Sequence, residues 1–238
     1  RTMSGYASAI TIFSPTGNLF QVEYAVKASE QGSCSVAVRG KDCLVLGVEK
    51  KDVTKLQEAK TLKKILQLDD NMFFAFSGLQ ADARVLANIA RVECQSYRIN
   101  FSETPTVDYI SRYISSVQQK YTQKGGVRPF GISILLVGYD SKGNPRLFQT
   151  DPSGACVEWK ANAIGRNEKQ AREILEKNFQ ADLDEKAAIH LAGQALAEAA
   201  EKGSKNIEIL VVRKDGAQYL MDTEVEAVIN AATEQKQQ

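Results

Sequence analysis

Four cysteines and one histidine are the residues best suited to metal or redox chemistry. The cysteines are widely and irregularly spaced, without a Cys-x-x-Cys pair, at Cys34, Cys43, Cys94 and Cys156. A structural zinc site needs closely spaced thiolates or imidazoles, and His190 is the only histidine of the chain. The spacing therefore predicts free thiols in a reducing compartment, the cytoplasm or the nucleus, with no metal and no cofactor.

Sequence motifs of other chemistry are missing as well. The chain has no Gly-x-Ser-x-Gly motif, no glycine-rich phosphate loop and no second histidine. Its 30 basic and 29 acidic side chains leave a net charge of +1, so the positive excess that favours nucleic acid or an anionic membrane is absent. The apolar run of residues 132–137, interrupted only by Ser133, is too short to cross a bilayer, and residues 1–8 lack the apolar stretch of a secretory signal. We expect a globular protein that binds neither nucleic acid nor membranes.

The most distinctive stretch of the chain is AITIFSPTGNLFQVEYAVKASEQG, residues 9–32. Residues 9–13 are apolar and β-branched, which predicts an extended segment. Pro15 and Gly17 follow within residues 14–18 and predict a turn. Gly32 is expected to end the helix that comes next, in the left-handed conformation.

That helix, residues 19–30, has apolar groups on two faces. One face carries Leu19, Val22, Ala25 and Val26, at helical spacing. Phe20 and Tyr24 form a second stripe on the neighbouring face. A short helix of this kind is expected to lie over the domain and also to contact another molecule.

The rest of the chain alternates between groups of strands and pairs of helices. Antiparallel hairpins and paired helices are both buried when two stacked sheets lie between two helical layers, so we expect an α+β fold, a four-layer αββα sandwich. We expect one domain, residues 1–238, with tails at 1–8 and 234–238. Strand patterns cover residues 33–39, 42–49, 62–68, 71–77, 131–139, 146–150, 155–160, 206–213 and 217–221, and helix patterns cover 82–97, 106–124, 168–179, 184–202 and a last helix capped by Asp222.

The N-terminal stretch resembles the signature of proteasome alpha-type subunits. That signature runs Tyr-Asp-Arg-Ala, a β-branched pair, Phe-Ser-Pro-x-Gly and then Leu-Phe-Gln-Val-Glu-Tyr-Ala. The chain departs from it at Ala7 and Ser8, where the family has Asp and Arg, and at Lys27, where Glu is usual. The matching positions are Tyr6, Ala9, residues 13–15, Gly17 and residues 19–25.

The resemblance continues through most of the chain and implies a fold. The fold is the αββα sandwich of N-terminal-nucleophile hydrolases, in agreement with the order of the predicted elements. Within the family, the combination is most similar to the fourth alpha-type subunit of the eukaryotic ring. The similar stretches are residues 91–96, 112–114, 121–123, 128–131, 149–154 and 159–166.

The resemblance also implies a function without catalysis by this chain. Alpha-type subunits form the outer, seven-membered ring of the 20S proteasome, which controls substrate entry in ubiquitin-dependent and other protein degradation. Peptide hydrolysis belongs to the beta-type subunits stacked on that ring. The implied partners are other alpha-type subunits, beta-type subunits and the C-terminal tails of activators or regulatory particles. The ring is expected to be hetero-oligomeric.

An alternative from another class is a self-processing amide hydrolase that uses Ser33. The catalytic relatives with this fold, the beta-type subunits, use an N-terminal Thr, and the free amine of that Thr is the base for its own hydroxyl. Ser33 stands where that Thr would be, Glu49 near the supporting acid and Lys64 near the catalytic lysine. The 32 residues before Ser33 would have to be removed, so we expect no catalytic residue. A free-standing interaction module is a third possibility.

The resemblance implies two sets of site residues. Lys64, Gly32 and Leu79 match an activator-tail pocket between neighbouring subunits, in which the lysine ammonium meets the carboxylate of the tail. The alternative for Lys64 is a solvated surface lysine on a strand, whereas a helix stop at Gly32 is compatible with the pocket role.

The second set matches a cluster that orders the N-terminal tails around the axial opening of the ring. Its members here are Tyr6, Pro15 and Tyr24, and Ala7 replaces the Asp that would complete it. The alternative for Tyr24 is an ordinary half-buried helix residue. Asp82 and Arg84 are expected to balance the charge at a helix start.

Overall fold

The computed structural model describes residues 11–50, 56–58, 61–199 and 207–234. For residues 233 and 234 it describes the backbone but not the side chains. Two five-stranded sheets form its centre. The first has the order β10-β9-β2-β1-β8 and the second the order β3-β4-β5-β6-β7. The first consists of β1 (Ser35–Arg39), β2 (Cys43–Glu49), β8 (Ala161–Ile164), β9 (Ile207–Arg213) and β10 (Gly216–Tyr219), and the second of β3 (Ile65–Asp69), β4 (Met72–Gly78), β5 (Ile132–Tyr139), β6 (Pro145–Thr150) and β7 (Cys156–Trp159).

Every strand pair in both sheets is antiparallel, which confirms the predicted hairpins. Leu46 of β2 lies opposite Ala37 of β1 and Leu210 of β9, and Ala75 of β4 lies opposite Leu135 of β5. These residues all point between the two sheets, where they are fully buried. The central strands are apolar on both faces because each sheet is covered on both sides.

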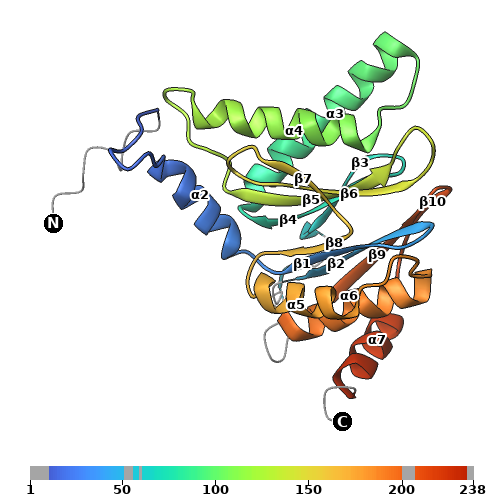
Figure 1. Ribbon diagram of the computed structural model, residues 1–238. Coiled ribbons are helices and arrows are strands. Elements are labelled where there is room, and N and C mark those ends of the chain that lie inside the picture. The colour runs from blue at the N-terminus through green and yellow to red at the C-terminus, as the bar shows by residue number, and fades with distance from the viewer. Residues whose placement is uncertain (1–10, 51–55, 59–60, 200–206, 235–238) are drawn as a thin grey trace.

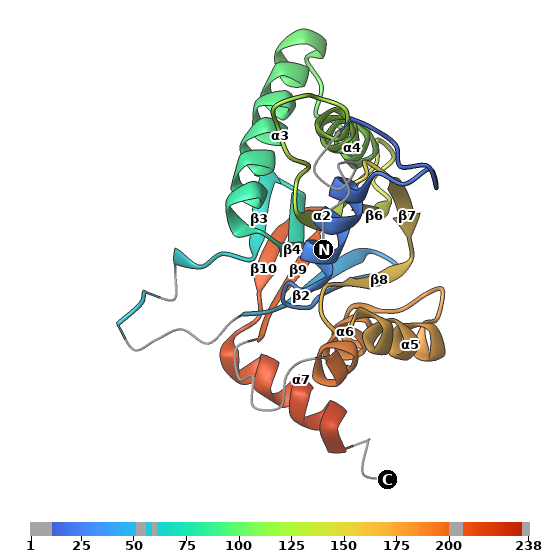
Figure 2. The same cartoon turned by 90° about the vertical axis from the view of Figure 1, so that its left-hand side faces the viewer.

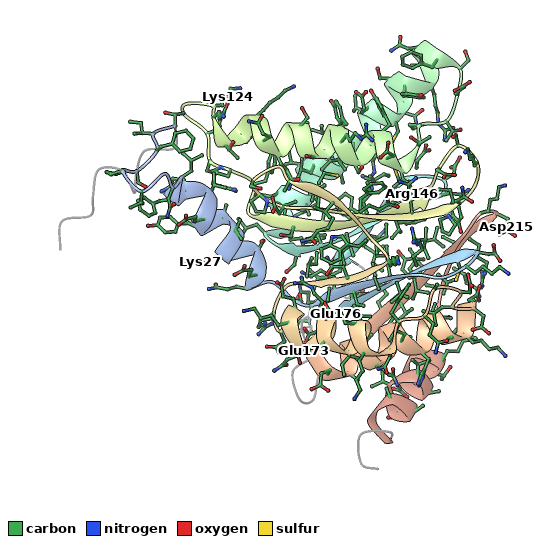
Figure 3. The ribbon with its side chains drawn as sticks, viewed as in Figure 1. Lys27, Lys124, Arg146, Glu173, Glu176 and Asp215 are labelled. Carbon is green, nitrogen blue, oxygen red and sulfur yellow. The ribbon has the colours of Figure 1, made fainter. Side chains whose placement is uncertain are left out.

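The described residues form six helices, and all but α2 belong to the two outer layers (Figures 1 and 2). The pair α3 and α4 covers the outer face of the second sheet, and the pair α5 and α6 covers the first, with α7 packed on α6. Figure 3 shows the space between the sheets and beneath the helices filled by side chains. The helices are α2 (Phe20–Glu30), α3 (Gln80–Phe101), α4 (Val107–Thr122), α5 (Glu168–Asn178), α6 (Glu185–Ala199) and α7 (Asp222–Glu234). The predicted four-layer sandwich is therefore confirmed.

Helix α2 lies outside these layers and packs by its last turns against one end of β4 and β5 (Figure 1). Ala25 and Ser29 are its buried residues. Tyr24 is 44% exposed, and Phe13, ahead of the helix, is 61% exposed. The predicted two-faced helix is thus present, and its second apolar stripe faces away from the sandwich.

Several details differ from the sequence-based expectation. Of the predicted extended segment, residues 9 and 10 lie outside the described residues, and residues 11–13 are neither helix nor strand. Strand β8 was not predicted, because Ala161–Ile164 contains Asn162 and two alanines and forms a strand only by pairing with β1. Asp222 is the first residue of α7 and not its cap. No described helix is both long and apolar enough to cross a membrane.

The structural reason for a glycine at position 32 also differs from the prediction. Its φ is not positive, and α2 is capped by Gln31, which has a right-handed conformation. A Cβ at Gly32 would overlap the backbone nitrogen of Gly78 and the Ser77 hydroxyl. Glycine is therefore required there for a close approach of two backbones, and the left-handed helix stop was wrong.

Candidate functional site

Strand β4 brings the three predicted pocket residues to one end of the second sheet. Lys64 immediately precedes β3, and its Nζ lies 4.8 Å from the centre of the Phe76 ring on β4. Gly78 ends β4 and lies against Gly32, and Leu79 follows it. The ammonium over a ring is a cation–π contact, worth about 1 kcal/mol. Residues far apart in sequence thus gather around the end of β4.

Leu79 forms the apolar part of this site. Leu79 is 46% exposed although it stands at the junction of β4 and α3. The Leu79 N–H donates to the Gly131 carbonyl at 3.0 Å. A Cβ at Gly131 would lie 2.9 Å from Leu79 Cδ1, so the leucine side chain rests directly on the glycine backbone.

Asp82 was expected to balance charge at the helix start, and the structure gives it more specific partners. Its carboxylate accepts two hydrogen bonds from Arg128, at 2.6 and 2.8 Å, and one from the Gly131 N–H at 3.0 Å. Burial alone would raise the pKa of Asp82, but these hydrogen bonds and the Arg128 charge outweigh it and lower the pKa. Arg84 is exposed. The sequence signal was the acidic residue in the first turn, whereas its partners lie 46 and 49 residues further on.

Ser33 is not placed as a nucleophile. While the residues of α2 remain attached ahead of it, the Ser33 nitrogen is a peptide nitrogen and cannot serve as a free amine base. Ser33 is 1% exposed and its Oγ is buried without a hydrogen-bond partner among the described residues. Glu49 binds the next residue, accepting from the Cys34 N–H at 3.4 Å. A peptide therefore has no access to the hydroxyl.

The predicted gate residues lie at the free end of α2, as far as the structure describes them. Tyr6 and Ala7 are outside the described residues. Pro15 is exposed in a turn that the Gly17 N–H closes by donating to the Ser14 carbonyl at 2.8 Å. Tyr24 stacks on Phe20, with ring centres 6.3 Å apart. The predicted turn is confirmed, whereas the cluster itself stays a prediction.

The cysteines are not arranged for catalysis. Burial, and next to it nearby acidic groups, raises the pKa of the Cys34 and Cys94 thiols to about 12, and burial raises that of Cys43 to about 11. All four cysteines are free. Among the described residues, no group of three or more His, Cys, Asp or Glu side chains could hold a metal ion. The raised pKa values keep these three thiols protonated, so none of them is activated as a nucleophile.

Comparison with known proteins gives the same picture. Residues 29–212 match the proteasome subunit family, and residues 6–28 match the N-terminal signature of its A-type members. The alpha type-7 proteasome subunit of Dictyostelium discoideum is 53% identical, over 98% of this chain and 95% of the relative. The alpha type-8 proteasome subunit of Mus musculus is 55% identical, over 89% of this chain and 86% of the relative. The chain therefore belongs to the proteasome subunit family as one of its alpha-type members, the type that is non-catalytic in this threonine-protease complex.

Proposed function

We propose that this chain helps to control substrate entry into the proteasome and offers activators a docking pocket, while beta-type partners cleave the peptides. The observation that carries the proposal is the gathering of Lys64, Gly32 and Leu79 at the end of β4. A cation beside a half-exposed leucine suits a peptide that ends in a free carboxylate and has an apolar side chain near that end. The second half of the pocket comes from the neighbouring subunit.

The docking function is tested by Lys64→Ala in the assembled complex. A charge-assisted contact to a carboxylate shielded from water is worth about 1.5–3 kcal/mol. We therefore expect Lys64→Ala to weaken activator-stimulated peptide hydrolysis, while native gels show the complex still assembled. Lys63→Ala is the matched control, because Lys63 is the adjacent lysine and is exposed. Equal stimulation in both variants would exclude Lys64 from the pocket.

We also propose that residues 1–8 form part of the entrance barrier. They contain no apolar run that could dock on the domain, so neighbouring subunits must order them. An open gate needs a second resting place for the tail, and Tyr6, Pro15 and Tyr24 would form it. Ala7 lacks the carboxylate that would accept a tyrosine hydroxyl, so this tail is held there less well than those of its neighbours.

Peptidase assays on two variants test the gate. Deletion of residues 1–8 should raise basal peptide hydrolysis, because less material fills the opening. Ala7→Asp should raise mainly the activator-stimulated rate, because it strengthens the open position. Unchanged basal hydrolysis after the deletion would remove this tail from the barrier.

The place of the chain in the ring is a finer proposal. We place it at the fourth position of a seven-membered hetero-oligomeric ring, on the similarity of residues 91–96, 128–131 and 159–166. Cross-linking followed by mass spectrometry identifies its two neighbours in the ring and tests that position. We place the complex in the cytoplasm and the nucleus, which the four free cysteines support, and cell fractionation tests that.

A further inference from the structure

Gly131 is held to the first turn of α3 by both of its backbone polar groups. Its N–H donates to Asp82 Oδ2 at 3.0 Å, and its carbonyl accepts from the Leu79 N–H at 3.0 Å. Leu79 and Asp82 stand three residues apart on the same helix start. The two bonds therefore fix the position of Gly131 relative to α3, with one of them made by a side chain that mutation can remove.

The position of Gly131 in turn determines where the Leu79 side chain can lie. Leu79 Cδ1 and Cγ would be 2.9 and 3.3 Å from a Cβ at Gly131, so the leucine packs on the glycine backbone with no room between them. On the other side of Gly131, its carbonyl lies where a Cβ of Gly78 would be. A shift of Gly131 away from α3 would therefore free Leu79 to move.

Arg128 binds the Asp82 carboxylate from the solvent-exposed side. Its guanidinium binds both oxygens of Asp82, and its Nη1 also donates to the Pro129 carbonyl at 3.1 Å. The Asp82 side chain is 10% exposed, whereas that of Arg128 is 62% exposed. The arginine therefore neutralises a buried carboxylate without being buried itself, and without Asp82 it can return to water.

We propose that Asp82 is a positioning residue of the activator-tail pocket. It holds Gly131 against α3, so that Leu79 presents a fixed apolar wall to a peptide whose terminal carboxylate is bound by Lys64. The ligand class is an extended peptide with a free C-terminal carboxylate and an apolar side chain close to it. This inference rests on the proposed docking function and deepens it.

The test uses the assembled complex and a synthetic activator-tail peptide, with the same peptide amidated at its C-terminus as the ligand control. The dissociation constant and the peptidase rate at saturating peptide are measured for each variant. We expect Asp82→Ala to weaken binding about three- to tenfold, the range for one lost hydrogen bond, with the saturating rate kept. Asp82→Asn keeps an oxygen for the Gly131 N–H, so binding should stay within about twofold.

A matched control separates positioning from general loss of ion pairs. Glu185→Ala removes a similar bidentate pair, in which Arg213 donates two hydrogen bonds of 2.7 Å on the opposite helical layer. We expect this variant to bind the tail peptide like the unaltered complex. A purely structural role of Asp82 would instead lower yield and saturating rate together and would not be rescued by asparagine.

Each outcome decides the inference. If Asp82→Ala binds the peptide normally while Lys64→Ala binds it weakly, the positioning role is wrong and the docking function stands. If Asp82→Asn is as weak as Asp82→Ala, the Gly131 hydrogen bond is not what positions Leu79, and the inference fails. If Lys64→Ala binds normally, the docking function fails and the positioning role with it.

Discussion

The junction where α2, β4, β5 and β8 end against one another contrasts with the outward face of α3. We call the first region the glycine junction, formed by Gly32, Gly78, Gly131 and Gly165. A Cβ at any of these positions would come within 2.9 Å of another atom, and at Gly78 that atom is the Gly131 carbonyl oxygen. Gly78 and Gly165 also have positive φ. Backbone atoms of another segment lie this close at Gly32, Gly78 and Gly165, and the Leu79 side chain does so at Gly131, so no larger residue fits at these positions.

On the outward face of α3, by contrast, apolar side chains are exposed and not packed in the core. Val85, Val92 and Ile99 recur every seven residues and are 49%, 69% and 81% exposed. The sequence places Val85 and Val92 on one side of a helix, and the structure shows that the core lies against the other side, at Leu86 and Ala90. A shallow groove runs along this face, lined by Arg91, Val92, Gln95, Ser96, Ile99 and Asn100.

The difference separates two kinds of constraint on the sequence. The glycine junction is constrained by the fold of this chain, because its contacts lie within the chain. The apolar residues on the face of α3 are half to mostly exposed, so they contribute little to that fold. Family membership implies assembly with other proteasome subunits, and we expect this exposed apolar face to be one of the surfaces in contact there.

The largest expected effect is that of Gly78→Ala. The new methyl group would overlap the Gly131 carbonyl oxygen at a backbone conformation that alanine disfavours, with φ of +112°. We expect the free energy of unfolding of the chain to fall by about 3 kcal/mol or more, measured by urea denaturation. Gly125→Ala is the control, because no atom lies within 4 Å of its added Cβ. Similar denaturation midpoints for both variants would contradict a rigid junction.

The double variant Val92→Ser, Ile99→Ser should have a smaller effect than Gly78→Ala. We expect it to weaken assembly of the complex and not the folding of the chain. The stability of the isolated chain should change by less than about 0.5 kcal/mol, as for other surface substitutions. Incorporation into the complex, followed on native gels with a tagged chain, should weaken by about 2 kcal/mol because two apolar anchors are lost. Met221→Ser, at a position 67% exposed, serves as the control elsewhere on the surface. Normal incorporation of the double variant would leave the face of α3 unexplained.

Most of the sandwich could be predicted because its signals are local. The apolar run of β5 and the turns at Gly40 and Gly216 each specify a strand or a hairpin within a few residues. Strand β8 has no such signal, since its four residues become a strand through pairing with β1. The buried side of α3 was not predicted, because Leu86 is its one large apolar residue among three alanines and a cysteine, while Val85, Val92 and Ile99 face outward.

The candidate site was predictable only in part, and through the resemblance. Lys64 and Leu79 were identified by their match to the family, and no local pattern relates one to the other. The hydrogen bonds that Asp82 accepts from Arg128 and Gly131 form only because the start of α3 packs against the start of β5. Such a contact is decided by packing of the whole sheet, so an isolated acidic residue in a helix start gave no sign of it.

A third prediction tests how far the rigidity of the glycine junction extends into α2. Ser29 donates to the Val26 carbonyl at 2.7 Å, and its Oγ lies 2.9 Å from that of Ser133 on β5. Ser29→Ala should cost about 1–2 kcal/mol of unfolding free energy, because the buried Ser133 hydroxyl loses its partner. The double variant Ser29→Ala, Ser133→Ala should cost less than the sum of the single ones. Strict additivity would show that the two hydroxyls are not coupled.

The smallest effect concerns the pH dependence of the contact between Asp82 and the glycine junction. The pKa of Asp82 is lowered in the folded chain, because the bonds from Arg128 and Gly131 outweigh the burial that would raise it. A carboxylate of this kind stabilises the fold above about pH 4 and loses that contribution as the pH falls through its folded pKa. The loss should appear first at the Gly131 N–H, which donates to Asp82.

Hydrogen exchange of the Gly131 amide, expressed as a protection factor, measures this contribution locally. We expect the protection to fall below about pH 4 in the unaltered chain and to stay level in Asp82→Asn, whose side chain does not titrate. The amide of Leu79, which donates to the Gly131 carbonyl, should follow the same course with a smaller amplitude. If Asp82→Asn shows the same fall, another group causes the acid sensitivity. The glycine junction would then be rigid through backbone contacts alone, without help from the charged pair at its edge.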